Sequence, residues 1–175
     1  ASRILGIPNP KVGLLNVGEE ESKGSELALE THEALKHCPS INFVGNVEGR
    51  DIMQGRADVV ICDGFVGNIA LKFAEGVAAT LFEMMKQEVA KDVRSKLGAV
   101  LMRPALTRVK RRVDYTEYGG APLLGIRGVS IIGHGSSNAK AIKNAIRVAM
   151  ESVQRRLIDS IEEEILKQGG YLTTA

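Results

Sequence analysis

The chain has 175 residues, of which 44% are hydrophobic, which excludes a disordered or fibrous protein and is enough to bury the core of one domain or of half a two-lobed protein. Aromatic residues make up only 4% and Trp is absent, a composition typical of α/β proteins in which helices cover parallel strands. The sequence predicts neither a membrane span nor a secretion signal, because it has no run of 18 apolar residues and no charged start followed by an apolar segment.

The net charge of +2 hides a local concentration of positive charge. Residues 86–112 contain nine Lys or Arg side chains against Glu88 and Asp92, so the rest of the chain is net negative. Nucleic-acid binding is not expected, because this basic stretch lacks interleaved aromatic residues for base stacking.

The two cysteines, Cys38 and Cys62, have no spacing typical of a metal site. We predict that both are reduced packing residues in a reducing cytosol, and that the chain carries neither a metal nor a cofactor.

Hydrophobic periodicity predicts alternating strands and helices. The N-terminal half is expected to contain strands at 11–17, 41–44 and 59–62 and helices at 22–35, 50–54 and 69–96. The C-terminal half is expected to contain an irregular apolar stretch at 97–104, a basic helical run ending near 112, a loop at 118–125, a strand at 129–132, and a final helix of more than 25 residues from 137. Residues 1–8 resemble the end of a helix, so an N-terminal half is expected to be missing from this sequence.

Three times, an apolar strand runs into a Gly-rich turn that opens a helix, at residues 12–24, 59–68 and 129–138. The free N–H groups at a helix start attract anions, and three such starts converging on one sheet edge predict a bound phosphate. One helix start stabilises an anion by only about 0.3–1 kcal/mol, so several starts together with a lysine or amides are needed. No dinucleotide or P-loop fingerprint accompanies these turns, so neither NAD nor ATP is predicted.

Each turn also has a structural interpretation. The first carries Lys23 beside three glutamates at 19–21, which could balance it, orient it or face water. In the second, Asn68 could cap the helix or direct its amide at a substrate, and Asp63 could brace the turn. In the third, His134 could act as an acid or base or serve structure and binding. The other two histidines, at positions 32 and 37, are expected to be solvated.

The motifs at 16–24, 63–68, 118–125 and 134–137, in this order and at these separations, resemble the C-terminal half of the bacterial phosphate acyltransferase family PlsX. The resemblance covers about residues 3–166. It implies a three-layer α/β/α fold like that of isocitrate and isopropylmalate dehydrogenases and of phosphate acetyltransferases, with a protruding helical segment around 80–112. The chain would then be the C-terminal part of a single domain.

The family makes acyl phosphate from inorganic phosphate and acyl groups on acyl carrier protein, for phospholipid synthesis. By resemblance, Lys23 and Asn68 are the catalytic candidates: Lys23 neutralises phosphate or the oxyanion, and Asn68 donates to the carbonyl. The phosphate cradle is completed by Gly67, His134, Gly135, Ser136 and Ser137. The resemblance further implies a homodimer in the cytoplasm, peripherally associated with the inner face of the cell membrane.

The basic segment mixes apolar and cationic residues, a composition suited to an anionic lipid surface. Its candidate contact residues are Leu101, Met102, Arg103, Arg108, Lys110 and Arg111. The alternative is that its apolar residues form a dimer interface while its cations bind acyl carrier protein. Two rival functions stay open: a coenzyme A-dependent phosphate acetyl- or butyryltransferase, and a non-catalytic fragment that binds acyl carrier protein or membrane.

Overall fold

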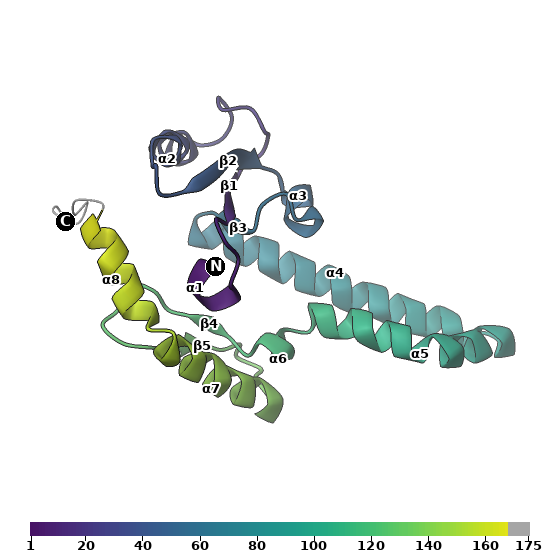
Figure 1. Ribbon diagram of the computed structural model, residues 1–175. Helices are drawn as coiled ribbons and strands as arrows, with labels where there is room; N and C mark the ends of the chain where they lie inside the picture. Colours follow the sequence, from purple (N-terminus) through teal and green to yellow (C-terminus); the bar gives the residue numbers. More distant parts are fainter. Residues whose placement is uncertain (168–175) are drawn as a thin grey trace. The chain divides into compact units, whose positions relative to one another are not determined.

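A computed structural model describes residues 1–167 of the chain. The chain divides into two compact units, Ala1–Ala79 and Thr80–Ala175, and the boundary falls inside helix α4 (Figure 1). Helices and a parallel sheet are both present, so the predicted α/β class is confirmed.

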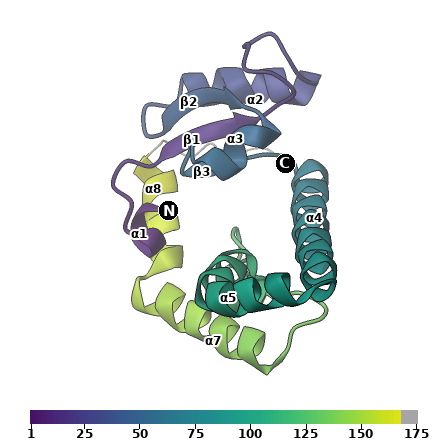
Figure 2. The ribbon, with the colours of Figure 1, turned by 90° about the vertical axis from the view of Figure 1, so that its right-hand side faces the viewer.

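The first unit is built on a parallel sheet of β1 (Lys11–Leu15), β2 (Asn42–Val47) and β3 (Val59–Ile61), in the order β2-β1-β3. Leu14 of the central strand pairs with Asn46 on one side and Ile61 on the other. Leu14 and Val47 are the most buried apolar side chains of this sheet. Because all three strands run in the same direction, their carboxyl ends lie at one edge, where the loops to the following helices begin (Figure 2).

The helices of the first unit begin and end where their caps dictate. α1 (Ser2–Leu5) ends at Gly6 in the left-handed conformation, as expected for a helix end. α2 (Glu26–Lys36), which packs on β2, starts after Ser25, whose hydroxyl accepts from the Ala28 N–H. α3 (Gly49–Gln54) starts with a reciprocal capping box between Glu48 and Asp51.

The long central helix differs from the prediction. α4 spans Gly64–Ala90 rather than 69–96, and a separate helix, α5 (Val93–Val113), follows it. The break lies where Asp92 caps α5, accepting from the Ser95 N–H at 2.8 Å. The predicted irregular stretch at 97–104 is wrong, because α5 continues through it with Pro104 inside the helix.

α4 buries none of its residues within the structure. It is also the one helix among residues 1–167 that is long and apolar enough to cross a membrane, judged by length and composition alone. The apolar surface of such a helix can equally pack against further protein, because apolar surface of this extent is seldom left in water.

The second unit contains α6 (Tyr115–Tyr118), a hairpin of β4 (Ala121–Pro122) and β5 (Ile131–Ile132), α7 (Ala139–Gln154) and α8 (Leu157–Lys167). The predicted strand at 129–132 is shorter than expected. It pairs antiparallel with β4 in a separate two-stranded sheet, so the third Gly-rich turn does not follow a strand of the parallel sheet. Gly119 approaches the backbone of α7 closely, and Asn144 of α7 donates to the Thr116 carbonyl at 2.8 Å.

The final helix is also not continuous as predicted. It breaks between α7 and α8 at Arg155 and Arg156, where Arg156 takes a left-handed φ of 50°. A residue in the left-handed conformation interrupts the hydrogen bonds of the helix. The apolar residues keep their helical spacing across this break, because that spacing reflects which side chains are packed and not the backbone conformation, and it therefore predicted a single helix.

Candidate functional site

The carboxyl edge of the parallel sheet carries a small cavity of about 200 Å³. Its walls come from the ends of β1 and β3, from the first turns of α2 and from the residues just after β3: Leu14, Leu15, Ser25, Leu27, Ala28, Thr31, Ile61, Cys62 and Asp63. The wall is mostly apolar, with polar groups near the helix starts. Partial desolvation of the sulfur, followed by the adjacent Asp63 carboxylate, raises the pKa of the Cys62 thiol, so the thiol stays protonated at neutral pH. Both cysteines are free, but Cys62 is exposed rather than packed as predicted.

Lys23 lies in the loop that joins β1 to α2, at this same edge. Its backbone is held on both sides: its N–H donates to the Glu20 carbonyl at 3.1 Å, and its carbonyl accepts from Asn16 Nδ2 at 2.8 Å. The next residue, Gly24, has a φ of 105°, and a Cβ there would lie 2.5 Å from Asn16 Oδ1. Glycine is therefore required beside Lys23.

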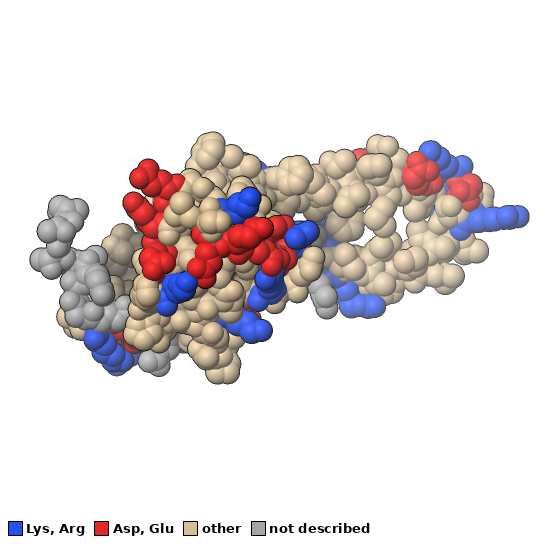
Figure 3. All heavy atoms as spheres, turned by 90° about the horizontal axis from the view of Figure 1, so that it is seen from above, with Lys and Arg blue, Asp and Glu red and all other residues tan. Residues whose placement is uncertain are grey.

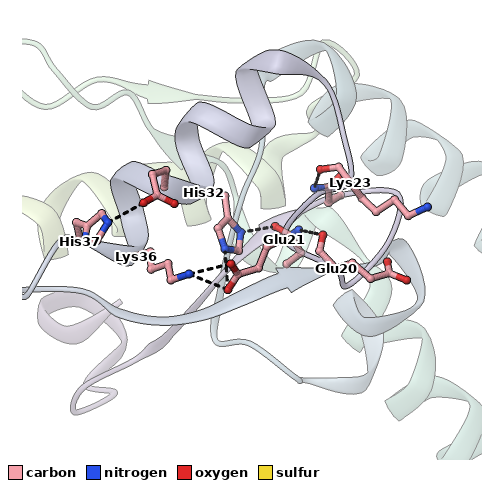
Figure 4. Close-up of polar contacts among 9 residues, drawn as sticks. Glu20, Glu21, Lys23, His32, Lys36 and His37 are labelled. Atoms are coloured by element: carbon pink, nitrogen blue, oxygen red, sulfur yellow. Dashed lines mark hydrogen bonds and ion pairs between the residues drawn. The ribbon is translucent and has the colours of Figure 1, made fainter.

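Two of the three acids of this loop, Glu19 and Glu21, are paired with cations other than Lys23. Glu19 pairs with Arg56 through both carboxylate oxygens, and Glu21 pairs with Lys36 at 2.8 Å (Figure 4). Hydrogen bonding and charge from these partners hold the pKa values of both glutamates below the ordinary value of 4.5. Figure 3 shows acidic side chains gathered over this part of the molecule with Lys and Arg among them.

The ammonium of Lys23 is left without a partner in residues 1–167, and Figure 4 shows it pointing away from the Glu21 ion pair. Of the three roles open to the glutamates in the sequence, balancing Lys23 is therefore excluded for Glu19 and Glu21. An exposed ammonium on a backbone fixed at both its N–H and its carbonyl is suited to meeting an anion from solution.

The second turn is capped by Asp63, not by Asn68. Asp63 Oδ1 accepts from the N–H groups of Phe65 and Val66 at 2.9 and 3.0 Å. Its carboxylate thus takes two of the amides that a phosphate would use, and its charge opposes an anion there. Asn68 lies one turn inside α4 and is exposed, so its amide is available to a substrate, and Gly67 precedes it.

The third turn lies in the second unit and is organised around His134. Its Nδ1 accepts from the Ser136 N–H at 3.2 Å and lies 2.7 Å from Ser136 Oγ. A backbone amide only donates, so Nδ1 carries the lone pair and the neutral ring holds its hydrogen on Nε2. The Ser137 hydroxyl donates to the His134 carbonyl at 2.6 Å, and Asn138 caps α7 by accepting from the Ala141 N–H. Gly135 lies between these groups and is exposed.

The structure thus brings the first and second turns, with Lys23, Gly67 and Asn68, to one edge of the parallel sheet. The third turn, with its residues 134–137, belongs to the other unit and to a different sheet. The single sheet edge predicted for all three turns is therefore found for two of them.

The predicted contact segment lies on α5. Leu101 and Met102 are 77% and 56% exposed, and Arg103, Arg108 and Lys110 are exposed beside them. Arg111 lies 3.9 Å from a Glu117 carboxylate oxygen. Val93, Leu97, Val100 and Leu101 recur at three- and four-residue spacing, so they share one face of this helix, and all are more than 60% exposed.

Sequence reasoning missed the role of His32. It was expected to be solvated but is only 4% exposed, whereas His37 is exposed as expected. The sequence does contain the signal: positions 28, 31, 32 and 35 recur at helical spacing and form the inner face of α2, whereas the apolar side chains of Leu27 and Leu29 are exposed.

Comparison with known proteins gives one consistent answer. The sequence model of the family described as "Fatty acid synthesis protein" matches residues 1–160. Among similar proteins, one from Heliobacterium modesticaldum is 57% identical over 94% of this chain and 49% of its own length, and one from Moorella thermoacetica is 56% identical over 92% and 47%. One from Synechococcus elongatus is 52% identical over 91% of this chain and 46% of its own.

All three relatives are named phosphate acyltransferase. The chain spans about half the length of these curated relatives. The extent of the match and the level of identity place it without ambiguity: the chain belongs to the fatty acid synthesis protein family.

Proposed function

We propose that the chain forms part of an acyltransferase that moves an acyl group from the thioester of acyl carrier protein to inorganic phosphate, giving acyl phosphate for phospholipid synthesis. The name phosphate acyltransferase, which its relatives carry, supports the acyl transfer to phosphate. What carries the proposal is the Lys23 ammonium, which has no partner among residues 1–167 and sits on a fixed loop at the same sheet edge as the start of α4, with Glu19 and Glu21 paired to other cations.

The reaction needs positioning and charge rather than an enzyme nucleophile. A phosphate oxygen attacks the thioester carbonyl carbon, the C–O bond forms, the C–S bond breaks, and the thiolate leaves and takes up a proton. Lys23 neutralises the phosphate or the developing oxyanion, and the Asn68 amide donates to the carbonyl oxygen. Gly67 allows close approach of the backbone, and His134, Gly135, Ser136 and Ser137 are proposed to complete the phosphate cradle.

The test is Lys23→Ala in the protein as its gene encodes it. Removing the ammonium should abolish most acyl phosphate formation, measured by trapping the product with hydroxylamine, while the thermal unfolding midpoint stays unchanged. Lys11→Ala is the matched control, because Lys11 is exposed at the opposite end of β1. Near-normal activity of Lys23→Ala would refute the assignment.

The thioester donor needs its own test. Acyl carrier protein and coenzyme A carry acyl groups on the same kind of thiol, so both substrates are compared at equal concentration. We expect turnover with the carrier-protein thioester; activity confined to acetyl- or butyryl-coenzyme A would support the alternative enzyme.

The full fold is also part of the proposal. A three-layer α/β/α arrangement like that of the isocitrate and isopropylmalate dehydrogenases would extend the parallel sheet of β1, β2 and β3 and cover both of its faces. A crystal structure of the protein as its gene encodes it would test this directly.

A second surface supports peripheral membrane contact. The exposed apolar face of α5 lies among cations, and we propose that it meets an anionic lipid surface on the inner face of the cell membrane. Flotation with anionic vesicles should be lost on Leu101→Glu with Met102→Glu and kept on Leu5→Glu with Met53→Glu, which places the same two charges on exposed apolar positions of the first unit. Undiminished flotation of the folded Leu101/Met102 variant would dispose of the lipid contact, and loss of a dimer instead would favour a subunit interface.

A further inference from the structure

A buried polar pair lies beneath the loop that carries Lys23. His32 of α2 is 4% exposed and Asn46 of β2 is 2% exposed, and His32 Nδ1 lies 2.9 Å from Asn46 Oδ1. The rings of Phe43 and His32 meet edge to face, with their centres 5.0 Å apart. Buried polar groups are costly unless hydrogen-bonded, so a fully satisfied pair at this position fixes its own geometry.

The orientation of the Asn46 amide follows from its second partner. Asn46 Nδ2 donates to the main-chain carbonyl of Glu20 at 2.8 Å, and a carbonyl only accepts. Oδ1 therefore faces His32, whose Nδ1 must carry the hydrogen. The other ring nitrogen, Nε2, lies 3.7 Å from Glu21 Oε1, beyond hydrogen-bond distance, so the bond to Asn46 is the one that orients the ring (Figure 4).

The same carbonyl connects this pair to Lys23. Glu20 O accepts from Asn46 Nδ2 and from the Lys23 N–H, using both of its lone pairs. On the far side, the Lys23 carbonyl accepts from Asn16 Nδ2. The backbone of Lys23 is thus one carbonyl away from a buried side chain of β2.

We propose that Asn46 is a positioning residue for Lys23, with His32 holding the Asn46 amide in the required orientation. The proposal rests on the function proposed for Lys23, because positioning matters only if the ammonium meets the substrate. Asn46 itself touches neither the ammonium nor the proposed phosphate, and it acts through the Glu20 carbonyl.

Asn46→Asp tests this by replacing the side-chain NH2 with a carboxylate oxygen. Aspartate keeps an oxygen for the His32 Nδ1–H but turns the donor that faces the Glu20 carbonyl into a second oxygen, so the bond to the loop becomes a repulsion. Asn42→Asp is the matched control: Asn42 is in the same strand and also donates to a main-chain carbonyl, that of Asn9 at 3.2 Å, but at the end away from the loop.

Two readouts are measured on the protein as its gene encodes it. Hydrogen exchange by mass spectrometry should show faster exchange of peptides covering residues 18–24 in Asn46→Asp, with the rest of the sheet unchanged. The kcat/KM for inorganic phosphate should fall by about tenfold to a hundredfold, as expected for a misplaced reacting group, and Asn42→Asp should change neither.

A second set of variants guards against misfolding of Asn46→Asp. His32→Asn places an amide donor near the position of Nδ1 and should keep both loop protection and activity, whereas His32→Leu should lose both. If Asn46 and His32 had only a structural role, Asn46→Asp and His32→Leu would lower the unfolding midpoint without a selective loss in kcat/KM for phosphate.

The outcomes separate this proposal from the proposed function. Unchanged exchange of residues 18–24 in folded Asn46→Asp overturns the positioning role, and so does a mobilised loop with normal kcat/KM. Full activity of Lys23→Ala overturns the function of Lys23 instead, whatever the exchange data show for Asn46.

Discussion

Glu19 and Arg56 form an ion pair in which the two terminal guanidinium nitrogens each meet one carboxylate oxygen, and Arg56 also lies 3.5 Å from the capping carboxylate of Asp51. The pair joins the loop after β1 to the segment that leads into β3. Together with the Glu21–Lys36 pair, it leaves Lys23 as the cation of this loop that faces solvent without a partner in residues 1–167.

These two ion pairs predict an acid-sensitive contribution to stability. The pKa values of Glu19 and Glu21 are lowered in the folded protein, so their stabilisation is complete above the unfolded value of 4.5 and is lost as the pH falls through the folded values. In urea titrations from neutral pH down to about pH 3, the double variant Glu19→Gln with Glu21→Gln should lose less stability than the wild type in this window.

The control for this titration is Glu30→Gln, which removes an exposed carboxylate of α2 that has no ion pair in the described chain. Added salt should reduce the difference between wild type and double variant, because both pairs are exposed and therefore screened. Equal acid sensitivity in all variants would contradict the prediction.

Substitutions at Gly119 and Gly125 measure the cost of a steric conflict apart from the cost of backbone strain. Both have positive φ, 86° and 83°, but a Cβ on Gly119 would lie 2.3 Å from the Ala145 backbone nitrogen of α7, whereas a Cβ on Gly125 meets nothing within 4 Å. Gly125→Ala should cost about 1 kcal/mol of unfolding free energy from strain alone. Gly119→Ala should cost clearly more, about 3 kcal/mol or above, because backbone atoms must also move. Similar losses in denaturant titrations of the two variants would show that α7 can move away.

Asp63 has two separable effects at the start of α4. Asp63→Ala removes the acceptor for the Phe65 and Val66 N–H groups and should lower the unfolding free energy by about 1 kcal/mol. Asp63→Asn keeps a capping oxygen but removes the charge, so stability should be largely retained while inorganic phosphate binds more tightly. Isothermal titration with phosphate checks the second effect; weaker binding by Asp63→Asn would show that the carboxylate does not oppose the anion.

The break between α7 and α8 is also testable. Arg156 holds a left-handed φ of 50°, which costs a non-glycine residue about 1 kcal/mol, and its exposed ion pair with Asp159 at 2.7 Å offsets only part of this. Arg156→Gly should therefore stabilise the protein slightly in urea denaturation. Arg155→Gly, at the preceding residue with a φ of −89°, should destabilise it; if both changes destabilise, the ion pair outweighs the strain.

Local patterns predicted much of the first unit. Strand–turn–helix units at Lys23 and Asn68 were readable because buried parallel strands are apolar runs and the following turns are rich in glycine. The sequence did not predict the break before α5, where Asp92 is the cap, or the continuation of α5 through Pro104. A single capping residue gives a weak signal, and whether a helix accommodates a proline depends on how its neighbouring turns adjust. The pairing of β5 with β4 was missed because a two-residue strand has too few side chains to show a period.

The α/β class, the family and the residues proposed to meet phosphate follow from the order of the amino acids, because composition, periodicity and motif order are properties of the chain alone. The folded chain was needed to see that Glu19 and Glu21 pair away from Lys23, that Asp63 caps α4, and that His32 is buried against Asn46. The contacts of Glu19, Glu21 and His32 join residues that lie far apart in the chain, so they form only when the sheet has brought β2, α2 and the loop together, whereas the Asp63 cap is a local contact in which Asp63 competed with Asn68 for one role.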